Sequence, residues 1–524
     1  MAQGSAFTHT GLNPNARVLV VGAGPTGLTA AAFLHRQSIA FDLIDPRHGP
    51  VTDSRALGVH ARTLEFMAML GIDQDFVSQG HKTRFMTFHR GRKKLFKLDF
   101  SRIKSLTRYP YMLVLPQSNS ETILVNHLEA NGQHVTWGSQ LTGLSQTEDV
   151  AFAQIQMPDG RTVPKTYDYV IGCDGAASFV RQAIDVPFEG QTYDARFLLS
   201  EVEIDNDAID RTSSHVFMGR KTTVAVIPQP GGVYRVVGPD FAVSNDGPEL
   251  AKRTEVTFDD FAQFMKTNDL LQHVTMRKPS RMVSYRVHKR VAAQFRKGRI
   301  FLAGDAAHVH SPAGGQGMNT GLHDVVNLSW RMAQVLHHKA APELLDVYEA
   351  ERRHAADIIV NGADAAMMKV VSRKLLPRVF FDVVAPVITR FYQPQRLMAS
   401  IAQIRWRYNG FDKTDGLQAA GGFEPGSRIA DLPLITGKRL FGVFGTHEDV
   451  VVVSAPDPEE YDVSAVQALA GAARVVTLAA PLRHRFVQQP CIVHCRPDGF
   501  ITHISPFPKG AIASQPHAAP SLTH

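Results

Sequence analysis

The chain has 524 residues, of which 44% are hydrophobic, and 56 Lys and Arg residues against 49 Asp and Glu residues give a net charge of +7. This length predicts two or three domains, and the composition is that of a soluble globular protein with a large core. No basic patch is interleaved with aromatic residues, so we expect no nucleic-acid partner. A basic surface would instead attract anionic cofactors.

Sequence signals for secretion or membrane insertion are weak. The first fifteen residues are polar, unlike a signal peptide. The most apolar late stretch, 379–391, contains an aspartate, a proline and an arginine, so we expect no membrane span. The three cysteines, Cys173, Cys491 and Cys495, form neither a disulfide framework nor a zinc site. A cytoplasmic, reduced protein is therefore expected.

The clearest motif is a glycine turn between a predicted strand, 18–21, and a helical run that begins at Leu28. In Gly22-Ala-Gly-Pro-Thr-Gly27, Gly22 permits the tight turn, Gly24 lets the backbone approach a pyrophosphate, and Gly27 lets the helix pack on the strand. A second apolar run ends in Asp45, which is placed to accept a hydrogen bond from a ribose. This order predicts a dinucleotide-binding βαβ unit; the alternative is a glycine turn without a ligand.

The pattern then changes along the chain. Strand and helix alternate to about residue 80, and 84–115 is strand-like and basic. The stretch 117–130 is an amphipathic helix, and 197–290 alternates in short runs that predict an inserted antiparallel sheet. A buried strand at 300–303 leads into a helix that ends near 338, and further helices follow to about 408.

The last hundred residues predict a small separate α/β domain. A linker-like segment at 421–426 precedes two apolar strands, 449–454 and 473–477, with a helix over 463–472 between them. Cys491 and Cys495 in Cys-Ile-Val-His-Cys are not spaced as CxxC and lie on a predicted strand, so we expect no disulfide between them.

Two further segments carry polar groups where ligands of α/β sheets bind. Asp174 follows a strand and either shapes a loop beside a cofactor or forms a structural ion pair with Arg181. Asp305 follows the strand 300–303 and is placed to bind a ribitol or ribose hydroxyl. The run 312–320 then opens a helix whose amides suit an anion. His308 and His310 alone are too few ligands for a metal site.

Arginine and amide side chains complete the predicted site. Arg55 precedes a predicted helix and is better placed than Arg62 to bind phosphate or carboxylate. Gln117 opens the helix 117–130 and either contacts the cofactor or caps the helix.

Four motifs in this order are GAGPTG at 22–27, SRALGVHARTLE at 54–65, CDG at 173–175 and AGDAAHVHSPAGGQGMNTG at 303–321. Together they resemble the class A flavoprotein aromatic hydroxylases of the para-hydroxybenzoate hydroxylase fold. Arg108-Tyr-Pro110, the chain length and the C-terminal segment make the chain similar to the phenol hydroxylase and pentachlorophenol monooxygenase branch, in which this segment is a thioredoxin-like domain.

The resemblance implies an α/β fold with a Rossmann-like FAD-binding domain, an inserted antiparallel-sheet substrate domain and a C-terminal thioredoxin-like domain. The expected boundaries are 16–84, 116–190 and 290–410 for the first, 85–115 and 191–289 for the second, and 421–515 for the third. It further implies one FAD, NAD(P)H as reductant, molecular oxygen, and hydroxylation of a phenolic or polycyclic ring through a flavin C4a-hydroperoxide. A homodimer is possible.

The predicted site combines positions within the family motifs with residues of the inserted sheet, namely Phe217, Val224, Val226 and Arg235. Catalytic candidates are Arg55, Pro312 and Arg235. Cofactor candidates are Gly22, Gly24, Pro25, Thr26, Gly27, Asp45, Arg47, Arg55, Gln117, Asp174, Gly304, Asp305, Gly315, Gly317, Met318 and Asn319. Substrate-pocket candidates are Leu57, Phe217, Val224, Val226 and Arg235, although core packing explains the three apolar sheet residues equally well.

One departure and several alternatives remain. In the phenol hydroxylases that the chain resembles, an Asp two residues after the Arg55 position takes the phenol proton, whereas here Leu57 stands there. This favours an acidic or extended substrate, or stabilisation of the anion by His60 or Arg235. A halogenase, epoxidase, dehydrogenase or non-catalytic redox sensor on the same scaffold stays open. The absence of a GxSxG motif disfavours an acyl hydrolase.

Overall fold

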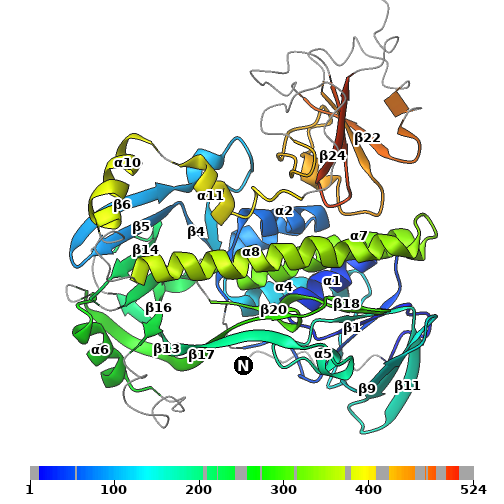
Figure 1. Ribbon diagram of the computed structural model, residues 1–524, viewed down its shortest axis with the longest axis horizontal. Helices are drawn as coiled ribbons and strands as arrows, with labels where there is room; N and C mark the ends of the chain where they lie inside the picture. The colour runs from blue at the N-terminus through cyan, green and yellow to red at the C-terminus, as the bar shows by residue number, and fades with distance from the viewer. Residues whose placement is uncertain are drawn as a thin grey trace, which may run out of the picture. The chain divides into compact units, whose positions relative to one another are not determined.

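The structure, a computed structural model, divides into two compact units, residues 1–403 and 404–524. It describes residues 11–52, 56–204, 209–220, 222–241, 256–271, 274–311, 315–371, 379–392, 394–408, 424–454, 466–467, 470–479 and 491–506. Figure 1 shows helices and sheets in the first unit and a small sheet in the second. Each unit is described by itself below.

A six-stranded sheet forms the centre of the first unit, with the strand order β18-β19-β12-β1-β2-β8. Its strands are β1 (Val18–Val21), β2 (Phe41–Asp45), β8 (Thr136–Trp137), β12 (Tyr169–Gly172), β18 (Arg296–Lys297) and β19 (Ile300–Leu302). Strand β1 pairs in parallel with β2 and β12, and all of its residues are buried. An apolar run of this kind is what a central parallel strand covered on both faces requires.

Helices pack around this sheet where the sequence predicts them. They are α1 (Pro25–Arg36), α4 (Gln117–Ala130), α7 (Gly317–Leu336) and α8 (Asp346–Val371). The predicted helix over 117–130 is confirmed as α4. Helix α1 contacts both α4 and α7, and α8 runs alongside α7 (Figure 1). This arrangement brings the start of α7, some 290 residues after α1, to the same end of the sheet as the glycine turn.

The second sheet of this unit has eight strands in the order β20-β17-β13-β16-β15-β14-β5-β6. Its strands are β5 (Phe85–Arg90), β6 (Lys93–Asp99), β13 (Phe188–Ile204), β14 (Ser213–Met218), β15 (Thr223–Pro228), β16 (Val233–Asp240), β17 (Met276–Ala292) and β20 (His308–Val309). The inserted antiparallel sheet is confirmed, with one difference: β14 pairs with β5 in parallel. Because β5 comes from an earlier part of the chain, no hairpin links the two strands and their direction is not constrained to be antiparallel.

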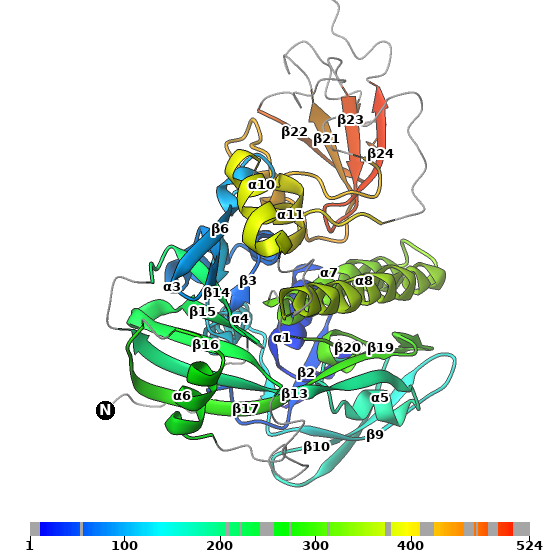
Figure 2. The ribbon, with the colours of Figure 1, turned by 60° about the vertical axis from the view of Figure 1, so that its left-hand side comes forward.

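Helix α6 (Phe258–Thr267) covers one face of this sheet, as Figure 2 shows. It begins with a capping box in which Thr257 and Asp260 satisfy each other's backbone N–H groups. Phe261, Phe264 and Met265 of α6 form a buried cluster with alternate residues of the strands beneath. Residues of the opposite parity lie on the other face of the sheet, where Phe197 and Val287 form a second buried cluster.

Two three-stranded sheets and several short helices complete the first unit. The sheets have the orders β3-β7-β4 and β11-β10-β9. The remaining elements are β3 (Gly58–Val59), α2 (Ala61–Leu70), α3 (Asp73–Gln79), β4 (His81–Thr83), η1 (Phe100–Ile103), β7 (Met112–Val114), β9 (Gln140–Gln146), β10 (Ala151–Gln156), β11 (Thr162–Tyr167), α5 (Phe179–Ala183), η2 (Pro230–Gly232), η5 (Gly304–Ala306), η7 (Pro342–Leu345), η8 (Phe380–Val384), α10 (Ala385–Phe391) and α11 (Gln395–Ile401).

The second unit contains a four-stranded sheet with the order β22-β21-β23-β24. Its elements are η9 (Leu440–Gly442), β21 (Val450–Ser454), β22 (Arg474–Thr477), β23 (Cys491–Cys495) and β24 (Ile501–Pro506). The two strands predicted here are confirmed as β21 and β22, which pair in parallel. Half of the predicted helix 463–472 lies outside the described residues. The thioredoxin-like assignment stays a prediction.

This unit begins at residue 404 rather than at the predicted 421. The Tyr408 N–H donates to the Gly426 carbonyl at 2.9 Å, and the Arg428 Nε donates to the Ile404 carbonyl at 3.3 Å. These contacts join 404–408 to the segment that follows the predicted linker. The predicted division of the first unit into FAD-binding and substrate domains stays a prediction.

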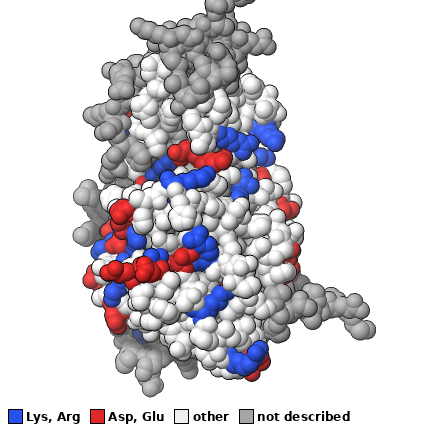
Figure 3. All heavy atoms as spheres, turned by 90° about the vertical axis from the view of Figure 1, so that its right-hand side faces the viewer, with Lys and Arg blue, Asp and Glu red and all other residues white. Residues whose placement is uncertain are grey.

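On the face drawn in Figure 3, basic and acidic side chains are interspersed. Among the described residues, no helix combines the length and the apolar character needed to cross a membrane.

Candidate flavin site

The glycine turn between β1 and α1 has the three features that a pyrophosphate needs. Gly22 has φ +99°, a conformation that favours glycine. A Cβ atom on Gly27 would lie 1.8 Å from the Gly22 carbonyl oxygen, so only glycine lets α1 approach the turn. A Cβ atom on Gly24 would meet no heavy atom within 4 Å. The three roles predicted from the sequence therefore have separate physical grounds.

The N-terminal end of α1 is open. Gly24 is its N-cap, no side chain caps the helix, and Pro25 occupies the first turn. Backbone N–H groups at such an end lack partners within the helix and attract anions. With the open space at Gly24, this end of α1 fits the pyrophosphate of a dinucleotide.

Asp45 ends β2 beside this turn and is held by two groups. Its carboxylate accepts the Ala23 N–H at 2.7 Å and the Arg47 Nε at 2.9 Å. Arg47 also contacts Glu121 at 3.2 Å. Burial alone would lower the pKa of Arg47, but the hydrogen bond and the charge of Asp45, with Glu121, raise it above its usual value. Asp45 thus fixes the turn, and its predicted contact with a ribose stays a prediction.

Gln117 joins the same group of side chains. Its Nε2 donates to Glu121 at 2.9 Å, and its Oε1 accepts the Ala56 N–H at 3.3 Å. The side chain therefore ties the start of α4 to the segment that follows Arg55, rather than capping its own helix.

Asp174 does not use Arg181 in the way that the sequence suggested. It accepts the Ser178 hydroxyl at 2.6 Å and the Val180 N–H at 3.0 Å, while Arg181 donates to the Ala306 carbonyl at 2.8 Å. Burial raises the pKa of Asp174 above its usual value, although these hydrogen bonds oppose the shift. Arg181 thus connects the loop after β12 to the loop after β19, because carbonyl oxygens and not the carboxylate lie within its reach.

Asn319, near the start of α7, holds two loops together. Its Oδ1 accepts the His60 N–H at 2.9 Å and the Thr63 hydroxyl at 2.7 Å, and its Nδ2 donates to the carbonyls of Gly58 and Gly315. Asn319 is fully buried. Both ends of its amide bind protein, so the side chain positions the glycine loop. Its predicted contact with the cofactor stays a prediction.

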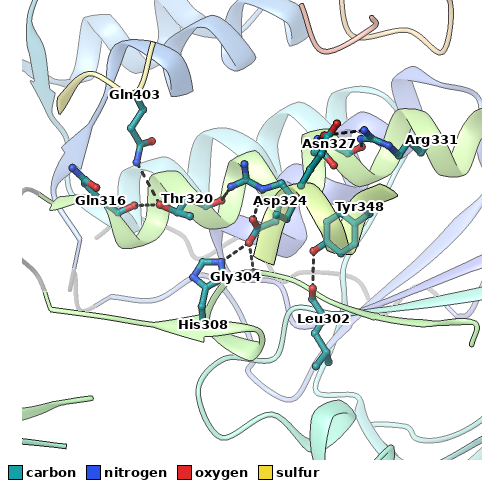
Figure 4. A network of polar contacts seen from close by, with 12 residues as sticks. Leu302, Gly304, His308, Gln316, Thr320, Asp324, Asn327, Arg331, Tyr348 and Gln403 are labelled. Carbon is teal, nitrogen blue, oxygen red and sulfur yellow. Dashed lines mark hydrogen bonds and ion pairs between the residues drawn. The ribbon is translucent and has the colours of Figure 1, made fainter. Parts of the chain in front are cut away.

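A buried carboxylate lies behind this loop. Asp324 of α7 accepts the His308 Nε2 at 2.7 Å, the Gly304 N–H at 3.0 Å and the Arg352 Nε at 2.8 Å (Figure 4). Burial alone would raise the pKa of Asp324, but the charges and hydrogen bonds of His308 and Arg352 hold it below its usual value. Thr320 extends the network, because its hydroxyl donates to Gln316 and its carbonyl accepts Arg352.

Asp324 and Arg352 could not be predicted from the sequence. They lie on two helices, far from any motif, and only the packing of α8 on α7 brings them together. The one sign in the sequence is His308, whose pattern with His310 suggests only a metal ligand. Within the described residues, no group of three or more His, Cys, Asp or Glu side chains is arranged to hold a metal ion.

The remaining cofactor candidates surround the same loops. Thr26 packs against Gly304 and Gly321, where a Cβ atom would lie 2.6 Å from the Thr26 hydroxyl in each case. Gly304 and Gly315 have positive φ values of 61° and 63°. Asp305 is exposed. The half-buried residues Gly317 and Met318 begin α7. The catalytic candidates Arg55 and Pro312 lie outside the described residues.

The substrate candidates divide between the two faces of the large sheet. Phe217, Val224 and Val226 are buried in the cluster under α6. This packing agrees with the core alternative and accounts for them without a ligand, and their pocket role stays a prediction. Side chains alternate between the two faces of a strand, and the sequence does not show which of the two faces α6 will cover. Leu57 is buried at 5% exposure.

Arg235 lies on the opposite face, because its neighbours Tyr234 and Val236 belong to the α6 cluster. It is 2% exposed and forms an ion pair with Glu201, its partner across β13 and β16. Burial lowers the pKa of Arg235, and Glu201 opposes the shift. A buried, oriented guanidinium on the face away from α6 is suited to hold an anionic oxygen.

These features define an α/β protein whose glycine turn and adjoining loops suit a flavin dinucleotide and which carries a second, eight-stranded sheet. Residues 15–363 match the family model described as FAD binding domain, and the chain belongs to this family of FAD-dependent aromatic hydroxylases. It is 35% identical to pentachlorophenol 4-monooxygenase of Sphingobium chlorophenolicum over 68% of this chain and 65% of that protein. It is 33% identical to 6-methylpretetramide 4-monooxygenase of Streptomyces rimosus over 79% of this chain and 74% of that protein.

A solved structure supports the same assignment. The anhydrotetracycline hydroxylase OxyS from Streptomyces rimosus matches with a TM-score of 0.71 and 27% identity, over 93% of this chain and 95% of that chain. The resemblance to aromatic hydroxylases inferred from the motifs is thereby confirmed, as are the α/β fold class and FAD as the cofactor.

Proposed function

We propose that this protein uses NAD(P)H and molecular oxygen to hydroxylate a phenolic or polycyclic aromatic substrate. The relatives named above act on pentachlorophenol and on 6-methylpretetramide, according to their names. The proposal extends these two substrate classes to this chain. Cytoplasmic location and homodimer formation stay predictions from the sequence.

One observation carries the proposal: the eight-stranded sheet is continuous with the loop that would hold the flavin. Strand β20 follows η5 directly and pairs with β17 through Arg290 and Val291. The Asp324 network anchors the same loop at Gly304 and His308. A ligand on the face away from α6 would therefore lie near a loop that the Asp324 network holds in place, and such positioning is what oxygen transfer needs.

When bound, FAD supplies electron transfer from NAD(P)H and activation of molecular oxygen, one atom of which enters the ring. Residues of this chain supply the remaining requirements. The open end of α1 binds the pyrophosphate, and Asn319 and Asp324 hold the loop at the start of α7. We infer that Arg235, fixed by Glu201, holds the oxygen of the substrate as an anion, which enriches the ring in electrons.

Leu57 indicates how acidic the substrate must be. It is buried and apolar and has no group that accepts a proton. His60 is engaged elsewhere, since its Nε2 lies 3.2 Å from the Gly315 carbonyl and donates to it. We therefore propose an acidic or extended aromatic substrate, which arrives as its anion or is ionised with the help of Arg235.

The test is a series of substituted phenols of graded pKa, assayed at pH 7 for NADPH oxidation, product formation and incorporation of ¹⁸O from labelled oxygen. Acidic phenols should give coupled, labelled product, and Arg235→Met should lose more activity on them than Arg235→Lys. Equal turnover of plain phenol would refute the inference from Leu57. Product without label would refute hydroxylation itself.

A further inference from the structure

A basic cleft lies outside the site described above. Its volume is about 750 Å³, and Lys82 of β4, Arg84, Arg102 and Lys104 line it together with Asp99 and Tyr111. Four cationic side chains thus face one carboxylate. Such an excess of positive charge in a concave surface raises the local concentration of anions.

Most of this charge is not neutralised by the protein. Arg84 donates to both oxygens of Asp99, at 3.0 and 2.9 Å, so this pair is satisfied. Within the described residues, Lys82, Arg102 and Lys104 take part in no ion pair. Ser101 adds a hydroxyl that accepts from Arg84 at 3.2 Å. A bound anion would complete this arrangement.

One wall of the cleft is aromatic. The Lys82 Nζ lies 5.3 Å from the centre of the Tyr111 ring. Burial raises the pKa of Tyr111 to about 12, so the ring is neutral at physiological pH. An aromatic face beside cations suits a ligand that combines a planar base with a phosphate.

The three-stranded sheet β3-β7-β4 connects the cleft to the loop at Gly315. Val59 of β3, Leu113 of β7 and Lys82 of β4 are register partners in a row across that sheet. The row crosses two strand spacings, so its ends lie about 10 Å apart. Gly58 precedes Val59 at the other end of the row, and a Cβ atom on Gly58 would lie 3.8 Å from the Gly315 carbonyl oxygen. A ligand of dinucleotide length can therefore reach from the cleft toward the loop at Gly315.

We propose that this cleft binds the 2′-phosphate of NADPH, with Arg102 and Lys104 as its main contacts and Tyr111 against the adenine. NADPH differs from NADH by the phosphate on the 2′-oxygen of its adenosine ribose, and arginine is the residue that commonly accommodates this phosphate. The inference rests on the proposed function for the use of a nicotinamide reductant, and it assigns both the preferred reductant and its binding site.

The experiment measures binding to the FAD-loaded enzyme by calorimetry, with NADP⁺, NAD⁺, adenosine 2′,5′-bisphosphate and inorganic phosphate as probes. The variant is Arg102→Gln combined with Lys104→Gln. The matched control is Lys266→Gln, which removes an exposed charge from α6. The variant should raise the Kd of NADP⁺ and of the bisphosphate about tenfold and leave that of NAD⁺ unchanged, whereas the control should change none of them.

Kinetics supply a second measurement. The variant should raise the KM for NADPH with little change in kcat, because the cleft binds the reductant and does not touch the reacting atoms. Unchanged NADP⁺ binding, equal weakening of NADP⁺ and NAD⁺, or equal affinity for inorganic phosphate and the bisphosphate would each overturn the proposal. Charge-dependent NADP⁺ binding without hydroxylation of any aromatic compound would refute the proposed function and leave this site standing.

Discussion

Gly24 and Gly27 stand three residues apart in one turn, but they exclude side chains for different reasons. A Cβ atom at Gly27 meets the backbone of the protein itself, whereas one at Gly24 meets only open space. The backbone at Gly24 has φ −71° and ψ −179°, which any residue adopts. The two positions therefore separate the requirements of the fold from those of the ligand.

We expect Gly24→Val to leave the free energy of unfolding of the apoprotein within about 0.5 kcal/mol of the original and to raise the Kd of FAD at least about tenfold. Gly27→Ala should instead lower the stability of the apoprotein by about 1–3 kcal/mol, because α1 must move away from Gly22. Denaturant unfolding and flavin fluorescence titration measure the two effects. Tight FAD binding by Gly24→Val would place the pyrophosphate elsewhere.

Asp324 offers a second test at the scale of one residue. Asp324→Asn leaves Arg352, at 1% exposure, without its counter-charge. Breaking a buried pair from one side costs about 3–5 kcal/mol, so we expect a loss of stability of that order. Asp159→Asn, which breaks an exposed pair with Arg161, is the control and should show no measurable change. Equal effects of the two substitutions would contradict the role given to the buried network.

The lowered pKa of Asp324 predicts that the stability of the folded protein depends on pH. Its pKa is lowered in the folded protein, so the unfolded chain binds its proton first as the pH falls. The stability that Asp324 contributes is complete above its unfolded pKa of about 4 and is lost as the pH falls through the folded pKa. Below pH 4 the unfolding free energy of the original protein should therefore fall more steeply than that of Asp324→Asn.

At the scale of secondary-structure elements, strand β23 keeps the two C-terminal cysteines too far apart to form a disulfide. Cys491 and Cys495 are its first and last residues, and both are buried and free. A strand separates residues four apart by about 13 Å, whereas a disulfide requires Cα atoms within about 7 Å. The motif predicts the same result, and the pairing of β23 with β21 and β24 holds the strand extended.

We expect none of the three cysteines to react with a thiol reagent in the native protein. Cys173 is buried as well, and burial raises the pKa of all three thiols, so little thiolate is present at neutral pH. Titration in denaturant should then reveal three thiols, since the sequence contains three cysteines. Reaction of only one thiol in denaturant, or reduction of insulin by the protein, would show that Cys491 and Cys495 form a redox pair.

The molecule as a whole divides after Gln403, and every cofactor candidate lies before that point. The family match ends at residue 363, well within the first unit. We therefore expect the chain truncated after Gln403 to bind FAD with an affinity similar to that of the full chain, measured by flavin fluorescence. A folded but colourless fragment that FAD does not reconstitute would show that the second unit takes part in flavin binding.

Residues close in sequence allowed the first part of the site to be predicted. The turn at Gly22–Gly27, the strand that ends in Asp45 and the helix over 117–130 depend on local backbone geometry and on the periodicity of apolar residues. These features are properties of short segments, so the sequence by itself determined the FAD-binding βαβ unit, the inserted sheet and the resemblance to aromatic hydroxylases.

Only the tertiary structure decided which distant groups meet. The contacts of Asp324 with Arg352, of Arg181 with the Ala306 carbonyl, and of Asn319 with Gly58 each join segments more than 25 residues apart. The face of the sheet that Arg235 shares with Glu201, and the burial of Phe217 under α6, depend on strand register and on the placement of α6. Long-range packing sets both, because alternation along a strand defines two faces but does not say which one a helix will cover.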